Sequence, residues 1–281
     1  MVNPWDFSVL QIIAVAGLGL VAGTLGGMLG VGGSIIMIPG LVMLFGIQDE
    51  HLFQASAMIA NVAVAAPAAW KHYKSGGTTR HILIWMMPFA IAFVFLGVYA
   101  SNLFTGPSGA RWLGRLLAVF LIYVVYANAR KLMAPAHHVA AAEAEAWQSQ
   151  KNVNAKSGGI GAGMGLLAGL LGIGGGALAV PMQQVLLKLP LRNCIANSSV
   201  AMVFSASVGA IMKSATLPQH GAHYGLTDGL ELAALLIPTA IIGGRLGASL
   251  TYVLPVKWIR AVFVVLMAVA AWKMASIPLP W

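Results

Sequence analysis

Long apolar stretches alternate with short polar connections along almost the entire chain. The first set covers roughly residues 9–29, 34–46, 54–70, 82–104 and 112–129, and the second set covers roughly residues 158–171, 176–188, 195–214, 229–252 and 259–276. As a helix, a segment of about 20 apolar residues reaches across a hydrocarbon layer about 30 Å thick. The pattern therefore predicts an all-α polytopic membrane protein with two sets of about five hydrophobic segments.

A glycine motif stands at the same place in both sets. Residues 30–34 read Gly-Val-Gly-Gly-Ser and residues 172–176 read Gly-Ile-Gly-Gly-Gly. A proline follows each motif at the same distance, as Pro39 in the first set and Pro181 in the second. The shared spacing indicates that the chain is internally duplicated.

We expect three parts: a first repeat at 1–132, a cytoplasmic linker at 133–157, which is the only long polar run, and a second repeat at 158–281. Each half has five crossings, or three if the segments beside the glycine motif form a re-entrant hairpin. Both counts are odd, so the halves are antiparallel and form two inverted repeats. The segments flanking each motif are interrupted or short, since 14 helical residues reach only about 21 Å, and we expect short or re-entrant half-helices broken at the glycines.

The basic residues predict an orientation for these segments. With the alternation above, only Arg111, Arg115, Lys213 and Lys273 fall on one side, whereas the other side receives Lys71, Lys74, Arg80, Arg130, Lys131, Lys151, Lys156, Lys188, Arg192, Lys257 and Arg260. Basic residues accumulate on the cytoplasmic side of membrane proteins. We therefore expect a multi-pass protein of the bacterial inner membrane, with the linker in the cytoplasm and both termini in the periplasm.

Composition narrows the class of protein. The chain is 59% hydrophobic and 8% charged, which is more apolar surface than one soluble core of this size buries. Its formal net charge of +9 is spread over short connections and does not indicate a nucleic-acid partner. Cys194 is the only cysteine, so no intramolecular disulfide forms. Neither His-Glu-x-x-His nor Gly-x-Ser-x-Gly occurs, and we expect no enzyme, no cofactor and no metal.

The glycine motifs are the first candidate site. Glycine lets the backbone leave helical geometry, and in a bilayer such backbone is tolerated only where it is buried in protein or lines a wet cavity. Its free amides, at the positive start of a following helix, suit an anion. Close helix packing is the alternative role for these glycines. The candidate binding residues are Gly32, Gly33, Ser34, Gly174, Gly175 and Gly176.

Small polar residues open the apolar segment that follows each motif. They cap that helix or donate hydrogen bonds to the oxygens of a bound oxyanion, and the sequence leaves both roles open. Gln183 stands in an otherwise apolar segment, where an interhelical hydrogen bond competes with ligand contact. The candidates of this second group are Ser56, Asn61, Gln183, Asn197, Ser198 and Ser199.

Arg245 is the only lysine or arginine deep inside a predicted span. Its burial costs about 2.5–3.5 kcal/mol on insertion scales, which calls for a partner. A multi-oxygen anion matches the fork of guanidinium donors, while pairing with Glu231 or with helix-end carbonyls is the alternative.

These duplicated features resemble the TauE/SafE family of sulfite and organosulfonate exporters. The resemblance is carried by residues 30–39, residues 172–181, residues 243–248 and the Leu254–Pro255 turn, and Ser34 departs from the usual third glycine. It implies an inner-membrane transporter that exports sulfite, sulfoacetate or a related sulfonate by alternating access. Its partners are then a small anion and the lipid bilayer, and a homodimer is left open. A small-anion channel and a non-transporting membrane assembly subunit are the alternative functions.

Overall fold

The protein is described from a computed structural model over residues 7–46, 50–104, 106–133, 152–220, 225 and 227–275. Within these ranges every regular element is a helix and no strand occurs, as the sequence predicts. Most of the predicted linker at 133–157 and both extreme termini lie outside the described residues.

Each predicted apolar segment corresponds to one helix. The first five are α1 (Val9–Leu29), α2 (Ser34–Phe45), α3 (Glu50–Lys74), α4 (Arg80–Asn102) and α5 (Gly106–Met133). The others are α7 (Val153–Leu171), α8 (Gly176–Leu186), α9 (Leu191–Thr216), the short 3₁₀ helix η2 (Leu217–His220), α10 (Asp228–Val253) and α11 (Val256–Ala275).

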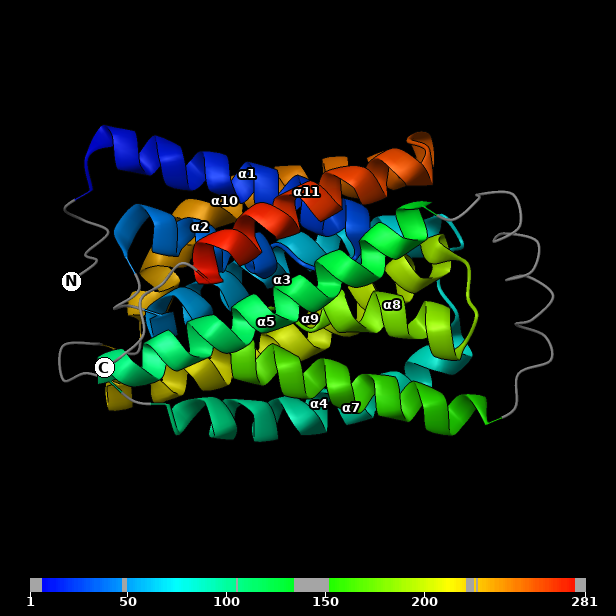
Figure 1. The fold of residues 1–281 in the computed structure, drawn as a ribbon, viewed down its shortest axis with the longest axis horizontal. Coiled ribbons are helices and arrows are strands. Elements are labelled where there is room, and N and C mark those ends of the chain that lie inside the picture. Colours follow the sequence, from blue (N-terminus) through cyan, green and yellow to red (C-terminus); the bar gives the residue numbers. More distant parts are fainter. Residues whose placement is uncertain are drawn as a thin grey trace.

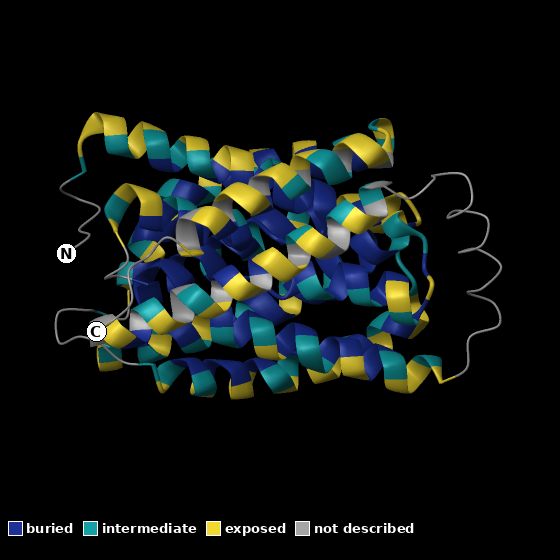
Figure 2. Cartoon of the chain, in the orientation of Figure 1, coloured by how far each residue is buried: buried dark blue, intermediate teal, exposed yellow. Residues whose placement is uncertain are grey.

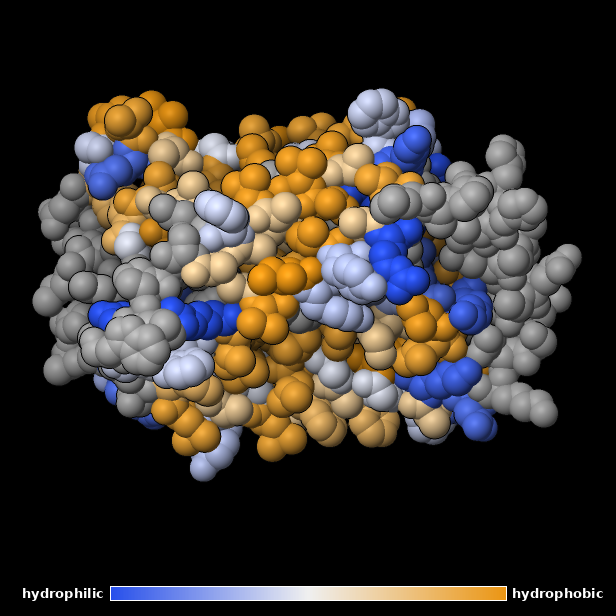
Figure 3. Space-filling model, viewed as in Figure 1, coloured by the Kyte–Doolittle hydropathy of each residue, from blue (hydrophilic) through white to orange (hydrophobic). Residues whose placement is uncertain are grey.

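Five stretches of the described chain are long and apolar enough to cross a membrane. They are α1, α3, α4, α9 together with η2, and α10. Figure 3 shows apolar side chains over the middle of the visible face and hydrophilic side chains mostly toward its two ends. Length, composition and surface together describe a multi-pass membrane protein.

The helices form a bundle around α3 and α9. Figure 1 shows α1 beside α10, α4 beside α7, and α5 crossing the same face as α11, and these are also pairs in direct contact. Among the five candidate spans, α3 and α9 have the largest buried share, at 72% and 67% of their most apolar windows. The buried residues in Figure 2 accordingly gather in the middle of the bundle.

Glycines allow the two outer helix pairs to approach closely. A methyl group added to Gly23 of α1 would lie 2.6 Å from the carbonyl oxygen of Ala240, and one added to Gly169 of α7 would lie 2.6 Å from the amide nitrogen of Val98. Small residues drive helix association in membranes because they let backbones come into contact. The spaced glycines of α1, α7 and α10 therefore serve packing.

Left-handed glycines end α1 and α7. Gly30 and Gly172 follow these helices with φ of +64° and +71°, conformations that glycine adopts without steric cost. One expectation needs correction here: α1 has 21 residues and is long enough to cross the membrane, so not every segment beside a motif is short. The short helices are α2 and α8, with 12 and 11 residues, or about 18 Å and 16 Å.

Candidate functional site

The two glycine breaks lie against each other. A methyl group added to Gly176 would lie 2.5 Å from the carbonyl oxygen of Gly30 and 2.8 Å from the Cα atom of Val31. Residues about 140 positions apart therefore meet backbone to backbone. The first turns of α2 and α8 start at this contact, and each helix start carries a partial positive charge.

Asn61 of α3 connects both breaks. Its side chain is fully buried, and its Oδ1 accepts a hydrogen bond from the backbone amide of Gly33 at 2.7 Å. The same side chain lies against Gly32 and Gly174, which both have positive φ. Its Nδ2 has no hydrogen-bond partner among the described residues. Because an unsatisfied buried donor costs about 1–3 kcal/mol, this nitrogen marks a place for a ligand or a water.

Met202 of α9 approaches the same two glycines. Its Sδ lies against the positions where Gly32 and Gly174 would carry a Cβ. Of the two side chains that lie against both Gly32 and Gly174, only that of Asn61 is a hydrogen-bond donor.

The predicted serines have different surroundings. Ser198 donates from Oγ to the carbonyl oxygen of Gly30 at 2.6 Å, and Ser34 donates to the carbonyl oxygen of Ala57 at 3.0 Å. Ser199 is buried with an Oγ that has no partner among the described residues. Ser56 donates to Leu52 within its own helix, so its hydroxyl is already satisfied.

The side chains of Gln183 and Asn197 are hydrogen-bonded to each other. The Nδ2 atom of Asn197 donates to Oε1 of Gln183 at 3.1 Å, and Nε2 of Gln183 donates to the carbonyl oxygen of Cys194 at 3.3 Å. The backbone amide of Thr79 donates to Oδ1 of Asn197 at 2.7 Å. These contacts tie α8 and α9 to the connection before α4, which matches the interhelical alternative.

Arg245 does not lie with these residues. Its side chain is exposed, on the opposite face of α10 from Gly243, Gly244 and Gly247, which pack on α1 and α3. Residues two positions apart on a helix point about 200° apart, so the packed glycines turn Arg245 outward. The sequence predicted that Arg245 is buried in its span, with a bound anion as one candidate partner, and the exposed position of its side chain contradicts that burial.

The structure also contains a buried polar cluster that the sequence did not single out. Lys213, interpreted from the sequence as a topology determinant, is 2% exposed and donates from Nζ to Oε1 of Gln54 and to Oγ of Ser101. Nε2 of Gln54 in turn donates to Oε1 of Glu50 at 3.3 Å, and Glu50 is 1% exposed. We name Glu50, Gln54, Ser101 and Lys213 the Lys213 cluster.

Two histidines adjoin the Lys213 cluster. The rings of His51 and His220 stack with a centroid distance of 3.6 Å. Nε2 of His51 lies 2.8 Å from the carbonyl oxygen of Phe104, and Nε2 of His220 lies 3.1 Å from Oδ1 of Asn102. The spacing of Glu50 and Gln54, four residues apart at the start of an apolar helix, was the available sequence signal for this region.

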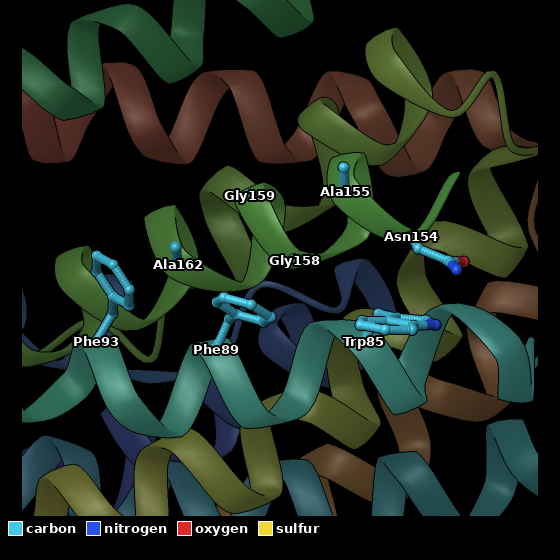
Figure 4. A pocket seen from close by; sticks show the side chains of 8 residues that line it. All are labelled: Trp85, Phe89, Phe93, Asn154, Ala155, Gly158, Gly159 and Ala162. Atoms are coloured by element: carbon cyan, nitrogen blue, oxygen red, sulfur yellow. The ribbon is translucent and has the colours of Figure 1, made fainter. Parts of the chain in front are cut away.

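A separate groove runs along the outside of the bundle. Figure 4 shows Trp85, Phe89 and Phe93 of α4 facing the glycine-containing face of α7. Trp85 and Phe89 are more than 40% exposed, and the lining is almost entirely apolar. These residues are not among those that contact the glycine breaks, and the groove suits an acyl chain better than an anion.

Comparison with known proteins gives one family and several relatives. The family model described as "Sulfite exporter TauE/SafE" matches residues 15–274. The chain is 30% identical, over 96% of its length, to the probable membrane transporter protein MamO of Paramagnetospirillum magneticum, and it spans 45% of that protein. It is 26% identical to the probable membrane transporter protein YunE of Bacillus subtilis, covering 89% of this chain and 92% of the relative. The chain thus spans less than half the length of its MamO relatives. No solved structure gives a significant match.

Proposed function

The chain belongs to the sulfite exporter TauE/SafE family, and from that premise we propose that it exports a small sulfur-containing anion from the cytoplasm by alternating access. The relatives are named as membrane transporters, which supports transport in general. The observation that carries the proposal is the unpartnered Nδ2 of Asn61 beside two touching glycine breaks.

An oxyanion fits this place by its chemistry. Sulfite, sulfoacetate and related sulfonates present several acceptor oxygens. Asn61 supplies a free donor at the breaks, and α2 and α8 direct the positive ends of their dipoles toward them. Ser199 adds a buried, unpartnered hydroxyl on α9, three residues before Met202. The substrate site that we propose is therefore built on Gly32, Gly33, Ser34, Asn61, Gly174, Gly175, Gly176, Ser198 and Ser199, without Arg245.

We further propose that the two halves are inverted repeats, bounded at 1–132 and 158–281. The packing pairs support this, since exchanging α1 with α7, α2 with α8, α3 with α9, α4 with α10 and α5 with α11 converts the major contacts into one another. The contact of α1 with α10 becomes that of α7 with α4, α3 with α10 becomes α9 with α4, and α2 with α3 becomes α8 with α9. The directions of the helices also support inverted repeats. Glycine contacts make α1 parallel to α10 and α4 parallel to α7, and Figure 1 shows α1 and α7 starting at opposite ends of the bundle.

The same arrangement supports an orientation. The end of the bundle where α3 finishes and α4 begins carries Lys71, Lys74 and Arg80, and the starts of α7, α9 and α11 add Lys156, Arg192 and Lys257. A basic excess of this kind marks the cytoplasmic side. We therefore place the linker at 133–157 in the cytoplasm and the termini in the periplasm of an inner membrane.

Thermal unfolding of the detergent-purified protein with sulfite, sulfoacetate, sulfate and acetate tests binding. An anion that binds the folded protein raises the unfolding midpoint, by the equivalent of about 2.7 kcal/mol at a hundredfold excess over Kd. We expect sulfite or sulfoacetate to raise it and acetate to leave it unchanged. If none of these anions shifts a well-folded protein, the binding site is refuted and an assembly subunit becomes the better interpretation.

Flux measurements then separate a transporter from a channel. Vesicles loaded with labelled sulfoacetate should release it faster when unlabelled sulfoacetate is present outside, and the rate should saturate. An alternating carrier requires this, because each reorientation carries at most one bound anion. Flux that grows linearly with concentration and shows no exchange would identify a channel.

A further inference from the structure

The Lys213 cluster buries two ionisable side chains, those of Lys213 and Glu50, between three helices. Lys213 comes from α9, Ser101 from α4, and Glu50 and Gln54 from α3. Burying a charge without full compensation costs several kcal/mol, and ionisable residues retained inside membrane spans mark ion pathways and proton relays. A purely structural contact between these helices would not require a lysine and a glutamate.

The hydrogen bonding inside the Lys213 cluster is incomplete. The Gln54 amide stands between the ammonium and the carboxylate, with Oε1 accepting from Lys213 and Nε2 donating to Glu50. Oε2 of Glu50 is buried and has no partner among the described residues. The carboxylate is thus half satisfied, and Oε2 is free to receive a proton.

One face of α3 joins this cluster to the glycine breaks. Gln54 packs directly against Gly172, with its Cβ and Cγ 2.8 Å from the place where that glycine would carry a Cβ. Asn61 lies seven residues further along α3, which is two turns on the same helix face and a rise of about 10 Å. Glu50 is eleven residues from Asn61, a rise of about 16 Å. Charges buried in protein are screened much less than charges in water, so an anion at the breaks still acts on the Lys213 cluster.

Other ionisable groups lie near the Lys213 cluster. His51 and His220 adjoin the cluster, each with an unpartnered Nδ1 among the described residues, and their face-to-face stacking disfavours a positive charge on both rings at once. On α4 the neighbouring groups Ser101 and Asn102 are neutral. At this end of the bundle, α10 adds Asp228 and Glu231 and α5 adds Arg111 and Arg115, and all four side chains are partly exposed to solvent.

We propose that the side chain of Glu50 is a proton-coupling site, which takes up one proton when the anion binds and releases it when the anion leaves. The inference rests on the anion transport proposed above. With the breaks empty, the carboxylate balances the Lys213 ammonium. When an anion arrives, Oε2 of Glu50 takes up a proton from water and forms an O–H bond, which offsets one negative charge of the anion beside the Lys213 ammonium; with a monovalent anion the buried charge stays near zero. Departure of the anion returns the proton to water.

The test counts protons on the purified wild-type protein. Sulfoacetate, whose two acidic groups stay ionised near neutral pH, is added in weak buffer with a pH-sensitive dye while binding is followed by the unfolding midpoint. We expect uptake approaching about one proton per bound anion within the titration range of Glu50. Binding without proton uptake between about pH 5 and 9 would overturn the proposal without any variant being needed.

Glu50→Gln, with Glu231→Gln as the matched control at the same end of the bundle, assigns the proton. The amide keeps the size of the side chain, so Glu50→Gln should bind sulfoacetate without taking up a proton and should exchange it at a rate independent of pH. Glu231→Gln should behave like the wild type. Equal proton uptake by Glu50→Gln and the wild type would refute the assignment. Absence of sulfoacetate binding by the wild type would instead refute the proposed function, and the coupling site with it.

Discussion

Asn61 and Met202 converge on the same two glycines, Gly32 and Gly174, from the two central helices of the bundle. Asn61 and Met202 occupy equivalent positions in the duplicated sequence. Gly172 lies against Gln54, seven residues before Asn61, and Gly30 lies against Ile195, seven residues before Met202. The centre of the duplicated fold is therefore chemically unequal. One half contributes an amide with a free donor and the other contributes a thioether that donates nothing.

Asn61→Asp is the sharpest test of this centre. Aspartate still accepts the hydrogen bond from the Gly33 amide, so the fold should be kept. It also replaces the free donor with a negative charge, and we expect anion affinity to fall by at least about tenfold, or about 1.4 kcal/mol. The sulfoacetate-induced shift of the unfolding midpoint measures this. An undiminished shift in Asn61→Asp would mean that the anion binds elsewhere.

Gly174→Ala tests whether the breaks need glycine. Gly174 has a φ of +73°, and a Cβ there would overlap the side chain of Asn61. Left-handed strain and overpacking together should lower the free energy of unfolding by about 2–4 kcal/mol. Gly17→Ala is the control, since nothing lies within 4 Å of its Cβ position and alanine favours the helix by up to about 1 kcal/mol. Equal unfolding midpoints for the two variants would contradict the strain argument.

The apolar pattern predicted the helices closely because membrane helices are determined locally. An α-helix satisfies all backbone hydrogen bonds within one segment, so an apolar segment of about 20 residues forms a helix from local sequence alone. The differences are at helix ends, such as α7, which begins at Val153 rather than at 158. Glycine and proline landmarks likewise located the breaks from local sequence.

The Lys213 cluster was harder to find, because three helices from both halves assemble it. In the sequence, Glu50 and Lys213 are 163 residues apart, and each alone is typical of a helix end. The outward orientation of Arg245 was easier to predict from the sequence, since Gly243 and Gly247 mark the packed face of α10 and residue 245 lies on the opposite face. That argument requires knowing that these glycines pack, which the structure supplies.

Arg245→Leu should therefore leave anion binding unchanged within about twofold, as expected for an exposed substitution away from the site. The same titration of the unfolding midpoint with sulfoacetate measures this affinity, and Asn61→Asp serves as the positive control for lost binding. If Arg245→Leu abolishes the shift while the protein remains folded, the outward placement of the guanidinium does not describe the anion-bound protein.

Gly165→Leu tests the contact between α4 and α7. A Cβ on Gly165 would overlap the carbonyl oxygen of Ala90, so the larger side chain must force the helices apart. Overpacking of this kind costs about 1–3 kcal/mol, and the unfolding midpoint should fall accordingly. Gly159→Leu, on the same helix but with nothing within 4 Å, should unfold close to the wild type. A similar loss in both variants would indicate that leucine disturbs α7 itself and not its packing.

The proposed orientation is tested by single cysteines in a Cys194→Ser background. Ser75 follows α3 and Thr227 precedes α10, and both are exposed at opposite ends of the bundle. A membrane-impermeant maleimide added to intact spheroplasts should label Thr227→Cys and spare Ser75→Cys, because the basic end of the bundle faces the cytoplasm. Inside-out vesicles should reverse the result. Labelling of Ser75→Cys from outside would place the basic end of the bundle in the periplasm. Labelling of both sites from the same side would contradict the arrangement in which α3 and α10 cross the membrane in the same direction.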